Sequence, residues 1–238
     1  MDFSNQFQQV QNSVVRLISI TGQAPNIQIV ASGSGVLISN GTKILTCSHC
    51  LVANTQTVAL FSGQNNGQIV TAIFNDAAAD IAVLQAPNPL GVGVGLGNSD
   101  LLRIGHEAFV AGFPSTGNTI TALFAHIAGF ETHNGNQHIK IDGSVNHGNS
   151  GGPLFNSNGE LVGIVNAKFG NLSAFLTQIE QANPQVGMII GGVNPVQAIQ
   201  QLIREMKKNL NLGVGTAIPL RLIGNLTNHV GDLLTPQV

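Results

Sequence analysis

The chain has 238 residues, and its 9 Lys and Arg against 11 Asp and Glu give a formal net charge of −2. Only 8% of the residues are charged and 43% are apolar, which excludes a disordered chain and the basic footprint of a nucleic-acid-binding protein. No apolar run approaches the roughly 18 residues that a transmembrane helix needs. We therefore expect a compact protein with neither nucleic acid nor a membrane among its partners.

The N-terminal segment, residues 3–12, is a polar, weakly amphipathic lead-in that contains Phe3 and Phe7. It lacks the basic and apolar regions of a signal peptide. Either the protein is cytoplasmic and is made without such a peptide, or it is exported and the peptide is absent from these 238 residues. The sequence leaves both alternatives open.

Short segments of β-branched and aliphatic residues, separated by turns, dominate the chain up to residue 167. A stretch rich in Gly and Pro at 86–99 is the best candidate for a linker between two halves. Many short strands with few helical stretches predict an all-β fold of sandwich or barrel type. The expected strands are 14–20, 27–31, 33–38, 43–46, 58–61, 69–74, 80–84, 107–111, 119–126, 137–141 and 161–167.

The composition changes at residue 171, and we expect a mainly helical insertion over 171–212. Residues 173–182 form one candidate helix, and 194–211 the clearer one, with Asn194 as its N-cap. Residues 216–220 return to extended structure, and 222–234 closes with a short helix. The apolar stripe of the clearer helix, which we expect to pack against the body of the protein, consists of Val196, Ile199, Ile203, Met206 and Leu210.

Two cysteines, Cys47 and Cys50, are too few for a disulfide framework, and they flank His49. A zinc site would need further ligands at suitable spacing along the chain, which the sequence does not provide. We therefore expect two reduced thiols near His49, with no metal and no cofactor. The other histidines that we weighed, none of which has a ligand spacing, are His106, His126, His133, His138 and His229.

The segment NHGNSGGPLF at 146–155 is the most informative stretch of the chain. Glycines on both sides of Ser150 allow a sharp turn and a close approach to a substrate. A serine nucleophile needs a base, a group that orients the base, and backbone N–H donors for the oxyanion. Taken alone, the segment favours a catalytic serine, with a glycine-rich turn between two strands as the alternative.

The partners that Ser150 needs stand elsewhere in the chain, as His49 after one strand and Asp80 at the start of another. Alone, each would ordinarily be a strand-end histidine or a turn carboxylate. Together, their order His–Asp–Ser matches one of the known chain orders of the catalytic triad. The three residues therefore predict a triad that only the fold can assemble.

Three blocks resemble those of chymotrypsin-fold serine peptidases: TCSHC at 46–50, DIAVL at 80–84 and GNSGGPL at 148–154. The sequence is most similar to the HtrA (DegP-like) branch, over roughly residues 12–170 and 213–235. The segments that carry this closer resemblance are LGNSDLLRIG at 96–105, AGFP at 111–114, DGSVNHGNSGGPL at 142–154, NGELVGI at 158–164 and TAIP at 216–219.

The resemblance implies a chymotrypsin-like double β-barrel, with an N-terminal barrel in 12–90 and a C-terminal barrel in 100–238, and an active site between them. It further implies that the protein is a serine endopeptidase. Ser150 would attack the scissile carbonyl, His49 would transfer the proton, and Asp80 would orient the imidazole. The oxyanion hole would be formed by backbone N–H groups in the segment Gly148, Asn149 and Ser150.

Two residues depart from relatives of this fold. Digestive members carry Asp directly before the nucleophile, where it pairs with a new N-terminus after cleavage, and this chain has Asn149. We therefore expect no zymogen cleavage, with opening and closing of loops as the switch. The HtrA branch usually has Pro or a variable residue where this chain has His147, which would stand at the rim of the cleft.

The specificity pocket follows from the same resemblance. Ser144 would lie at its base, and an uncharged base argues against a preference for Lys or Arg. Residues 215–217, which include Thr216, would form one wall. We expect a small or medium aliphatic residue before the cut. The opposite wall and the substrate-pairing edge would comprise Asn166, Ala167 and Lys168.

Two alternatives to an active peptidase stay open at this point. One is a non-catalytic or latent peptide-binding, chaperone-like module on the same fold. The other is a latent peptidase that a partner opens through the helix at 194–211. We expect a protein or peptide substrate and no PDZ-sized segment after residue 238. By analogy with the HtrA branch, a homotrimer would form through the N-terminal segment.

Overall fold

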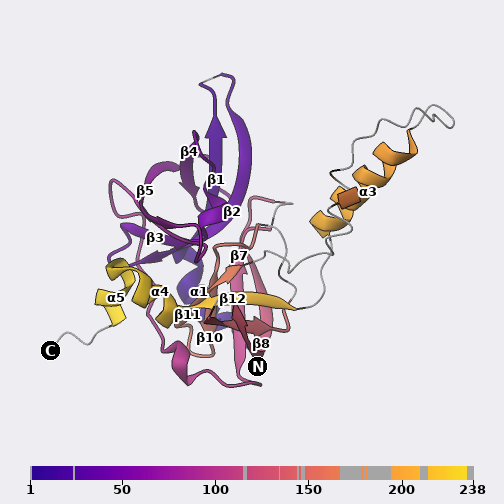
Figure 1. Cartoon of the computed structure of the whole chain (residues 1–238). Coiled ribbons are helices and arrows are strands. Elements are labelled where there is room, and N and C mark those ends of the chain that lie inside the picture. The colour runs from indigo at the N-terminus through magenta and orange to yellow at the C-terminus, as the bar shows by residue number, and fades with distance from the viewer. Residues whose placement is uncertain are drawn as a thin grey trace.

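Two closed barrels of six antiparallel strands make up the body of the protein in the computed structural model (Figure 1). The prediction of an all-β, chymotrypsin-like double barrel is confirmed. The residues that the structure describes are 2–23, 25–114, 117–133, 135–143, 145, 148–166, 178–179, 181, 194–209 and 214–234.

The first barrel has the strand order β1-β2-β3-β6-β5-β4. The predicted strands 27–31 and 33–38 are one continuous strand, β2, whose pairing with β1 shifts register between Ser19 and Ile20. Gly41, with φ 79°, takes part in the turn that leads into β3, as the Asn-Gly pair predicts. The strands are β1 (Val14–Thr21), β2 (Gln28–Ile38), β3 (Lys43–Thr46), β4 (Gln56–Leu60), β5 (Gln68–Asp76) and β6 (Ile81–Gln85).

The second barrel has the strand order β10-β11-β12-β9-β8-β7. Its strand β10 starts three residues after Ser150 and was not among the predicted strands. Residues 86–106, with the short 3-10 turn η3 (Ser99–Leu101), connect the two barrels. The strands are β7 (Glu107–Gly112), β8 (Thr121–His133), β9 (Asn136–Ile141), β10 (Pro153–Asn156), β11 (Leu161–Asn166) and β12 (Gly215–Pro219).

The period-two alternation of the strands separates three apolar clusters. Along β2, Leu37 points into the first barrel, whereas Val36 and Ile38 point to the seam between the barrels. The second barrel has its own interior cluster around Ile139. The apolar cluster at the seam, called the seam cluster below, contains Val36 and Ile38 of β2, Phe109 of β7, and residues of β10, β11 and β12. This shared core fixes one barrel against the other. A site at the seam is therefore held by a rigid base.

Helices at the two ends of the chain pack onto the seam. The lead-in forms α1 (Ser4–Val10) and the 3-10 turn η1 (Gln11–Ser13), and the Phe3 ring lies 5.1 Å from that of Phe109. The predicted C-terminal helix is two short helices, α4 (Leu220–Leu226) and α5 (Asn228–Leu234). Their apolar residues Leu220, Ile223 and Val230 are fully buried in the seam cluster.

The predicted helix at 194–211 is α3 (Pro195–Asn209), which stands apart from both barrels in Figure 1. The Asn194 side chain accepts hydrogen bonds from the N–H groups of Val196 and Gln197, as an N-cap does. Ile203 is buried and Ile199 is 48% exposed, but α3 stands apart from both barrels, so the prediction that its apolar stripe packs against the body is wrong. The candidate helix at 173–182, like most of the 171–212 insertion, lies outside the described residues.

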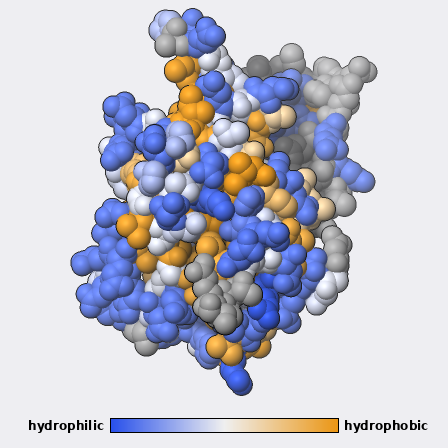
Figure 2. Space-filling model, turned by 90° about the vertical axis from the view of Figure 1, so that its left-hand side faces the viewer, coloured by the Kyte–Doolittle hydropathy of each residue, from blue (hydrophilic) through white to orange (hydrophobic). Residues whose placement is uncertain are grey.

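The surface in Figure 2 is largely hydrophilic, with apolar groups gathered below the upper tip. The hairpin of β1 and β2 forms that tip in Figure 1, and its residues Ile27, Ile29 and Val30 are about half exposed. Among the described residues, no helix combines the length and the apolar character needed to cross a membrane.

Candidate active site

The first element of the site is the 3-10 turn η2 (Ser48–Cys50), which directly follows the buried end of β3. This turn presents His49 at the seam, with its side chain 27% exposed. The backbone N–H of Ser48 donates to the Asp80 carbonyl oxygen over 3.2 Å, and the N–H of His49 donates to Asp80 Oδ1 over 3.0 Å. The turn that carries the imidazole is therefore bonded at two points to the residue before β6.

Asp80 lies just before β6, with φ 59°, in the left-handed region. The expectation that it opens the strand is wrong by one residue, and the left-handed turn aims its carboxylate at His49. Nδ1 of His49 lies 2.7 Å from Asp80 Oδ2. An ionised carboxylate only accepts, so Nδ1 carries the proton and Nε2 keeps a free lone pair. The imidazole is thus oriented as a base.

A third donor reaches the same carboxylate from the other barrel. Nδ2 of Asn166, the last residue of β11, donates to Asp80 Oδ2 over 2.9 Å. The sequence assigned Asn166 to the edge of the substrate cleft and missed this bond. The one signal for it is a polar residue ending an otherwise buried strand. Since Asp80 is 6% exposed, three donors replace the water that burial removes.

Ser150 lies in a turn that requires glycine at two neighbouring positions. Gly148 and Gly151 have φ values of 94° and 79°, which favour glycine. A Cβ atom on Gly151 would lie 2.1 Å from Thr46 Oγ1 and 2.3 Å from the Ser34 carbonyl oxygen, so a side chain cannot fit. The N–H of Gly151 donates to the Val165 carbonyl oxygen over 2.9 Å. These constraints hold the nucleophile loop against both barrels.

Ser34 of β2 connects the first barrel to the nucleophile loop. Its N–H donates to the Ser150 carbonyl oxygen over 2.8 Å, and its hydroxyl donates to the Gly148 carbonyl oxygen over 2.6 Å. The same hydroxyl oxygen accepts from the N–H of Phe113 over 2.8 Å. On the neighbouring turn, the thiol of Cys50 donates to the Ser150 carbonyl oxygen over 3.4 Å. The residue after His49 thus touches the backbone of Ser150.

The oxyanion segment has a fixed peptide between Gly148 and Asn149, because the Gly148 carbonyl is held by Ser34. Asn149 is 2% exposed, and its Oδ1 atom is buried without a hydrogen-bond partner among the described residues. A Cβ atom on Gly112 would lie 3.0 Å from it, so the residue that replaces the digestive-type Asp is a buried side chain beside β7.

Residues 33–164, more than half of the chain, match the family model of the trypsin-like peptidase domain. The chain belongs to the trypsin-like peptidase family. The matched residues include the turn of His49, Asp80, the Ser150 loop and strand β10.

Two relatives show that the chain is similar to the DegP-like branch of this family. The periplasmic serine endoprotease DegP of Salmonella typhimurium is 27% identical over 208 residues, which cover 85% of this chain and 36% of that protein. A probable periplasmic DegP-like serine endoprotease of Buchnera aphidicola is 31% identical over 207 residues, 84% of this chain and 36% of that protein. The chain spans about a third of the length of these curated relatives.

A solved structure of the same branch confirms the fold. The HtrA-type protease AlgW with a decapeptide has a TM-score of 0.71 and 20% identity, and the match covers 98% of this chain and 68% of that chain. The resemblance to HtrA-like chymotrypsin-fold peptidases is thus confirmed by relatives and by architecture.

The structure brings together only part of the predicted pocket of this trypsin-like peptidase domain. Asn166 and Thr216 are paired across β11 and β12, and the Thr216 hydroxyl donates to the Asn166 carbonyl oxygen over 2.9 Å. Four predicted residues lie outside the described residues, so their predictions are not tested: Ser144, His147, Ala167 and Lys168.

Neither cysteine forms a disulfide, and both thiols are buried, as predicted. Burial raises the pKa of the Cys50 thiol to about 11, so it stays protonated near neutral pH. The Cys47 thiol donates to the Val165 carbonyl oxygen over 3.3 Å. Its sulfur and one ligand atom each of His49 and Asp80 all lie within 4.8 Å of one another. The search along the sequence missed this cluster because Asp80 joins it through the fold.

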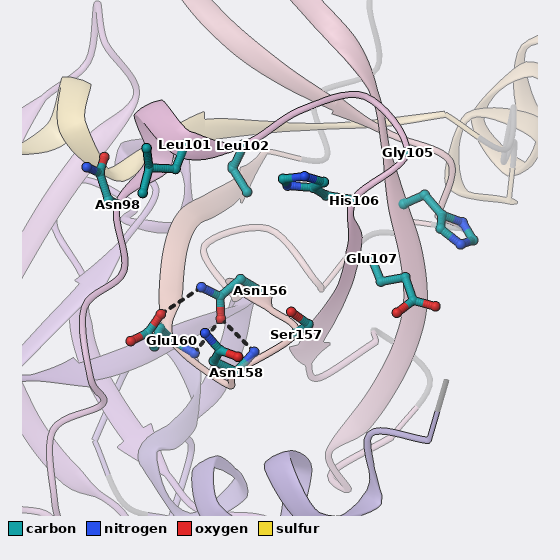
Figure 3. A pocket seen from close by; sticks show the side chains of 11 residues that line it. Asn98, Leu101, Leu102, Gly105, His106, Glu107, Asn156, Ser157, Asn158 and Glu160 are labelled. Carbon is teal, nitrogen blue, oxygen red and sulfur yellow. Dashed lines mark hydrogen bonds between the residues drawn. The ribbon is translucent and has the colours of Figure 1, made fainter.

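A separate cavity of about 630 Å³ lies on the second barrel, near the start of β7 and the turn between β10 and β11. In Figure 3, His106 and Glu107 lie across the cavity from Asn156 and Glu160. Asn156 Nδ2 donates a hydrogen bond to Glu160 Oε2 over 2.8 Å. His49, Asp80 and Ser150 are not among its described lining residues. This cavity is distinct from the candidate active site.

Proposed function

We propose that the chain is a serine endopeptidase domain with His49, Asp80 and Ser150 as its catalytic triad. The observation that carries the proposal is the oriented His49–Asp80 pair, whose turn contacts the backbone of Ser150. Family membership supports the reaction class, because the relatives are named serine endoproteases. Because the chain covers only about a third of the length of those relatives, we base the proposal of its own activity on the arrangement of His49, Asp80 and Ser150.

The proposed reaction follows from the tautomer of His49. Ser150 Oγ attacks the scissile carbonyl carbon while its proton passes to His49 Nε2, and the carbonyl oxygen becomes an oxyanion. The N–H groups of Gly148 and Ser150 are the proposed donors to that oxyanion. His49 then gives its proton to the amine nitrogen as the C–N bond breaks. Water repeats the sequence on the ester and releases Ser150.

The buried Asp80 carboxylate stabilises the imidazolium that forms in each step, and it need not take up a proton itself. Its three hydrogen bonds prevent it from rotating away from His49 Nδ1. Asn166 is a positioning residue in this scheme, because it acts on the substrate only through Asp80.

We further propose that the residue before the cut is small or medium aliphatic. In support, Thr216 of the predicted wall is uncharged, and its hydroxyl already donates to the Asn166 carbonyl oxygen, so this wall offers no charged partner to Lys or Arg. A peptide-library digest should show cleavage after residues such as Val and Ala, and cleavage mainly after Lys or Arg would refute this preference.

Labelling with a fluorophosphonate probe tests the catalytic proposal. The probe is expected to attach to Ser150 of the wild-type chain, and not to Ser150→Ala. Peptide hydrolysis by Ser150→Ala should fall by about six orders of magnitude, as in a comparable triad. A folded wild-type chain that neither reacts nor hydrolyses peptides, and yet binds them, would favour the peptide-binding module instead.

Partners and location are proposed from the relatives. Protein or peptide segments are the expected substrates, and the periplasmic naming of both relatives supports the exported alternative, which cell fractionation tests. A trimer through the N-terminal segment stays a prediction for analytical ultracentrifugation. Phe3 already contacts the rings of Phe109 and Phe124 within its own chain.

A further inference from the structure

We propose that Cys47, His49 and Asp80 form an inhibitory binding site for a zinc ion. The inference concerns regulation of the same site, and its effect on catalysis rests on the proposed function. Thiolate, imidazole and carboxylate are the three ligand types that bind zinc in proteins. The fold gathers one of each, with their ligand atoms within 4.8 Å of one another.

Small movements of the side chains complete the geometry. In a tetrahedral zinc site the ligand atoms lie about 3.3–3.8 Å apart, given metal–ligand bonds of about 2.0–2.3 Å. His49 Nδ1 and Asp80 Oδ2 are 2.7 Å apart because a proton lies between them. Replacing that proton by zinc widens the pair, and the Cys47 sulfur moves inward from its bond to Val165. The His49 ring, whose side chain is 27% exposed, provides the side from which an ion enters.

Charge balance suits this buried location. Cys47 is fully buried and Asp80 is 6% exposed, so an unbalanced ion would be strongly unfavourable there. One thiolate and one carboxylate cancel the two positive charges of zinc, and the imidazole adds none. The thiolate also selects zinc over magnesium or calcium, which prefer oxygen ligands.

Zinc at this position would stop the proposed reaction by reversing the tautomer of His49. With the metal on Nδ1, the proton of the neutral imidazole resides on Nε2. That atom is then a donor and cannot accept the hydroxyl proton of Ser150. The balance is one zinc ion taken up and one proton released from the Cys47 thiol, so binding strengthens as the pH rises.

Inhibition by zinc chloride, measured relative to each variant's own metal-free rate, is the first test. We expect wild type and Cys50→Ala to be inhibited alike and a chelator to restore both. The second thiol is the matched control because it bonds to Ser150 and lies outside the cluster. Cys47→Ala and Cys47→Ser should need at least about tenfold more zinc, since even losing an outer partner of a ligand typically costs 10–100-fold.

Cobalt binding is a second readout that does not need activity. Cobalt(II) added to Ser150→Ala should produce a thiolate-to-cobalt charge-transfer band, which disappears with Cys47→Ala and persists with Cys50→Ala. Retention of the band without Cys47, or its loss without Cys50, overturns the site. So does zinc bound only at the surface pair of His133 and His138, detected by its loss in His133→Ala. A band without any peptidase activity would refute the proposed function alone.

Discussion

Each barrel contains a histidine–aspartate pair with the same hydrogen-bond pattern. In the first, Asp80 accepts from the backbone N–H and from Nδ1 of His49. In the second, Asp142 accepts from the backbone N–H and from Nδ1 of His126. The side chains of the first pair are 27% and 9% exposed, and those of the second 41% and 49%.

The difference teaches that the pattern alone anchors a histidine and does not make it a base. The first carboxylate is buried, receives a third hydrogen bond from Asn166 and lies beside the nucleophile loop. The second is open to water, which screens its charge and competes for its oxygens. Burial and neighbouring groups, more than the pair itself, distinguish the proposed catalytic pair from the pair in a surface turn.

Replacing the two carboxylates in turn gives the largest expected contrast. Asp80→Asn should lower kcat by about four orders of magnitude, because an amide no longer fixes the Nδ1–H tautomer. Asp142→Asn, the matched change in the other barrel, should leave kcat within about twofold, since surface pairs contribute little. Steady-state kinetics on one peptide substrate measures both, and equal losses would refute the distinction.

Replacing Asn166, the third donor to Asp80, makes the His49–Asp80 pair more similar to the His126–Asp142 pair. Asn166→Ala should lower kcat by roughly 10–100-fold, as the loss of a hydrogen bond to a charged group costs about 1.5–3 kcal/mol. The freed carboxylate holds a proton more strongly and stabilises the imidazolium more. The acid limb of kcat/KM should therefore move to higher pH. A loss of activity with an unmoved pH profile would mean that Asn166 has only a structural role.

The tie between β2 and the nucleophile loop gives a smaller effect. Ser34→Ala leaves the Gly148 carbonyl and the Phe113 N–H without their partner and should cost about 1–3 kcal/mol in unfolding free energy. We expect about a tenfold fall in kcat as the oxyanion segment loosens. Ser32→Ala is the control, because Ser32 lies on the same strand as Ser34 and its hydroxyl accepts from Arg16 Nε of β1. Urea denaturation and kinetics would separate the two effects.

The smallest expected effect is on thermal stability at acidic pH, and it concerns the exposed pair of His126 and Asp142. The backbone N–H of His126 lowers the pKa of Asp142 below its ordinary value of 3.8. Its stabilising contribution is present above that value and is lost as the pH falls through the lowered one. The small difference in Tm between wild type and Asp142→Asn should therefore vanish in strong acid. A difference that grows below about pH 3 would contradict this assignment.

The sequence predicted most strands and the three blocks of the triad, because alternation, turn residues and short motifs are local signals. It placed Asp80 inside a strand, since periodicity does not reveal a left-handed residue before β6. It also missed the bond from Asn166 to Asp80, the cluster of Cys47 with the triad, and strand β10. The bond from Asn166 depends on how the second barrel meets the first, and the cluster depends on the pairing of β3 with β6. Local spacing along the chain encodes neither.

The seam cluster also affects when the protein can act. Strand β12 pairs with β9 and β11, and the buried residues of α4 and α5 fill the seam beneath the site. During synthesis these segments leave the ribosome after all three residues of the proposed triad. The order of translation therefore delays assembly of the proposed active site until nearly all of this fold exists, which would limit cleavage of the nascent chain by itself.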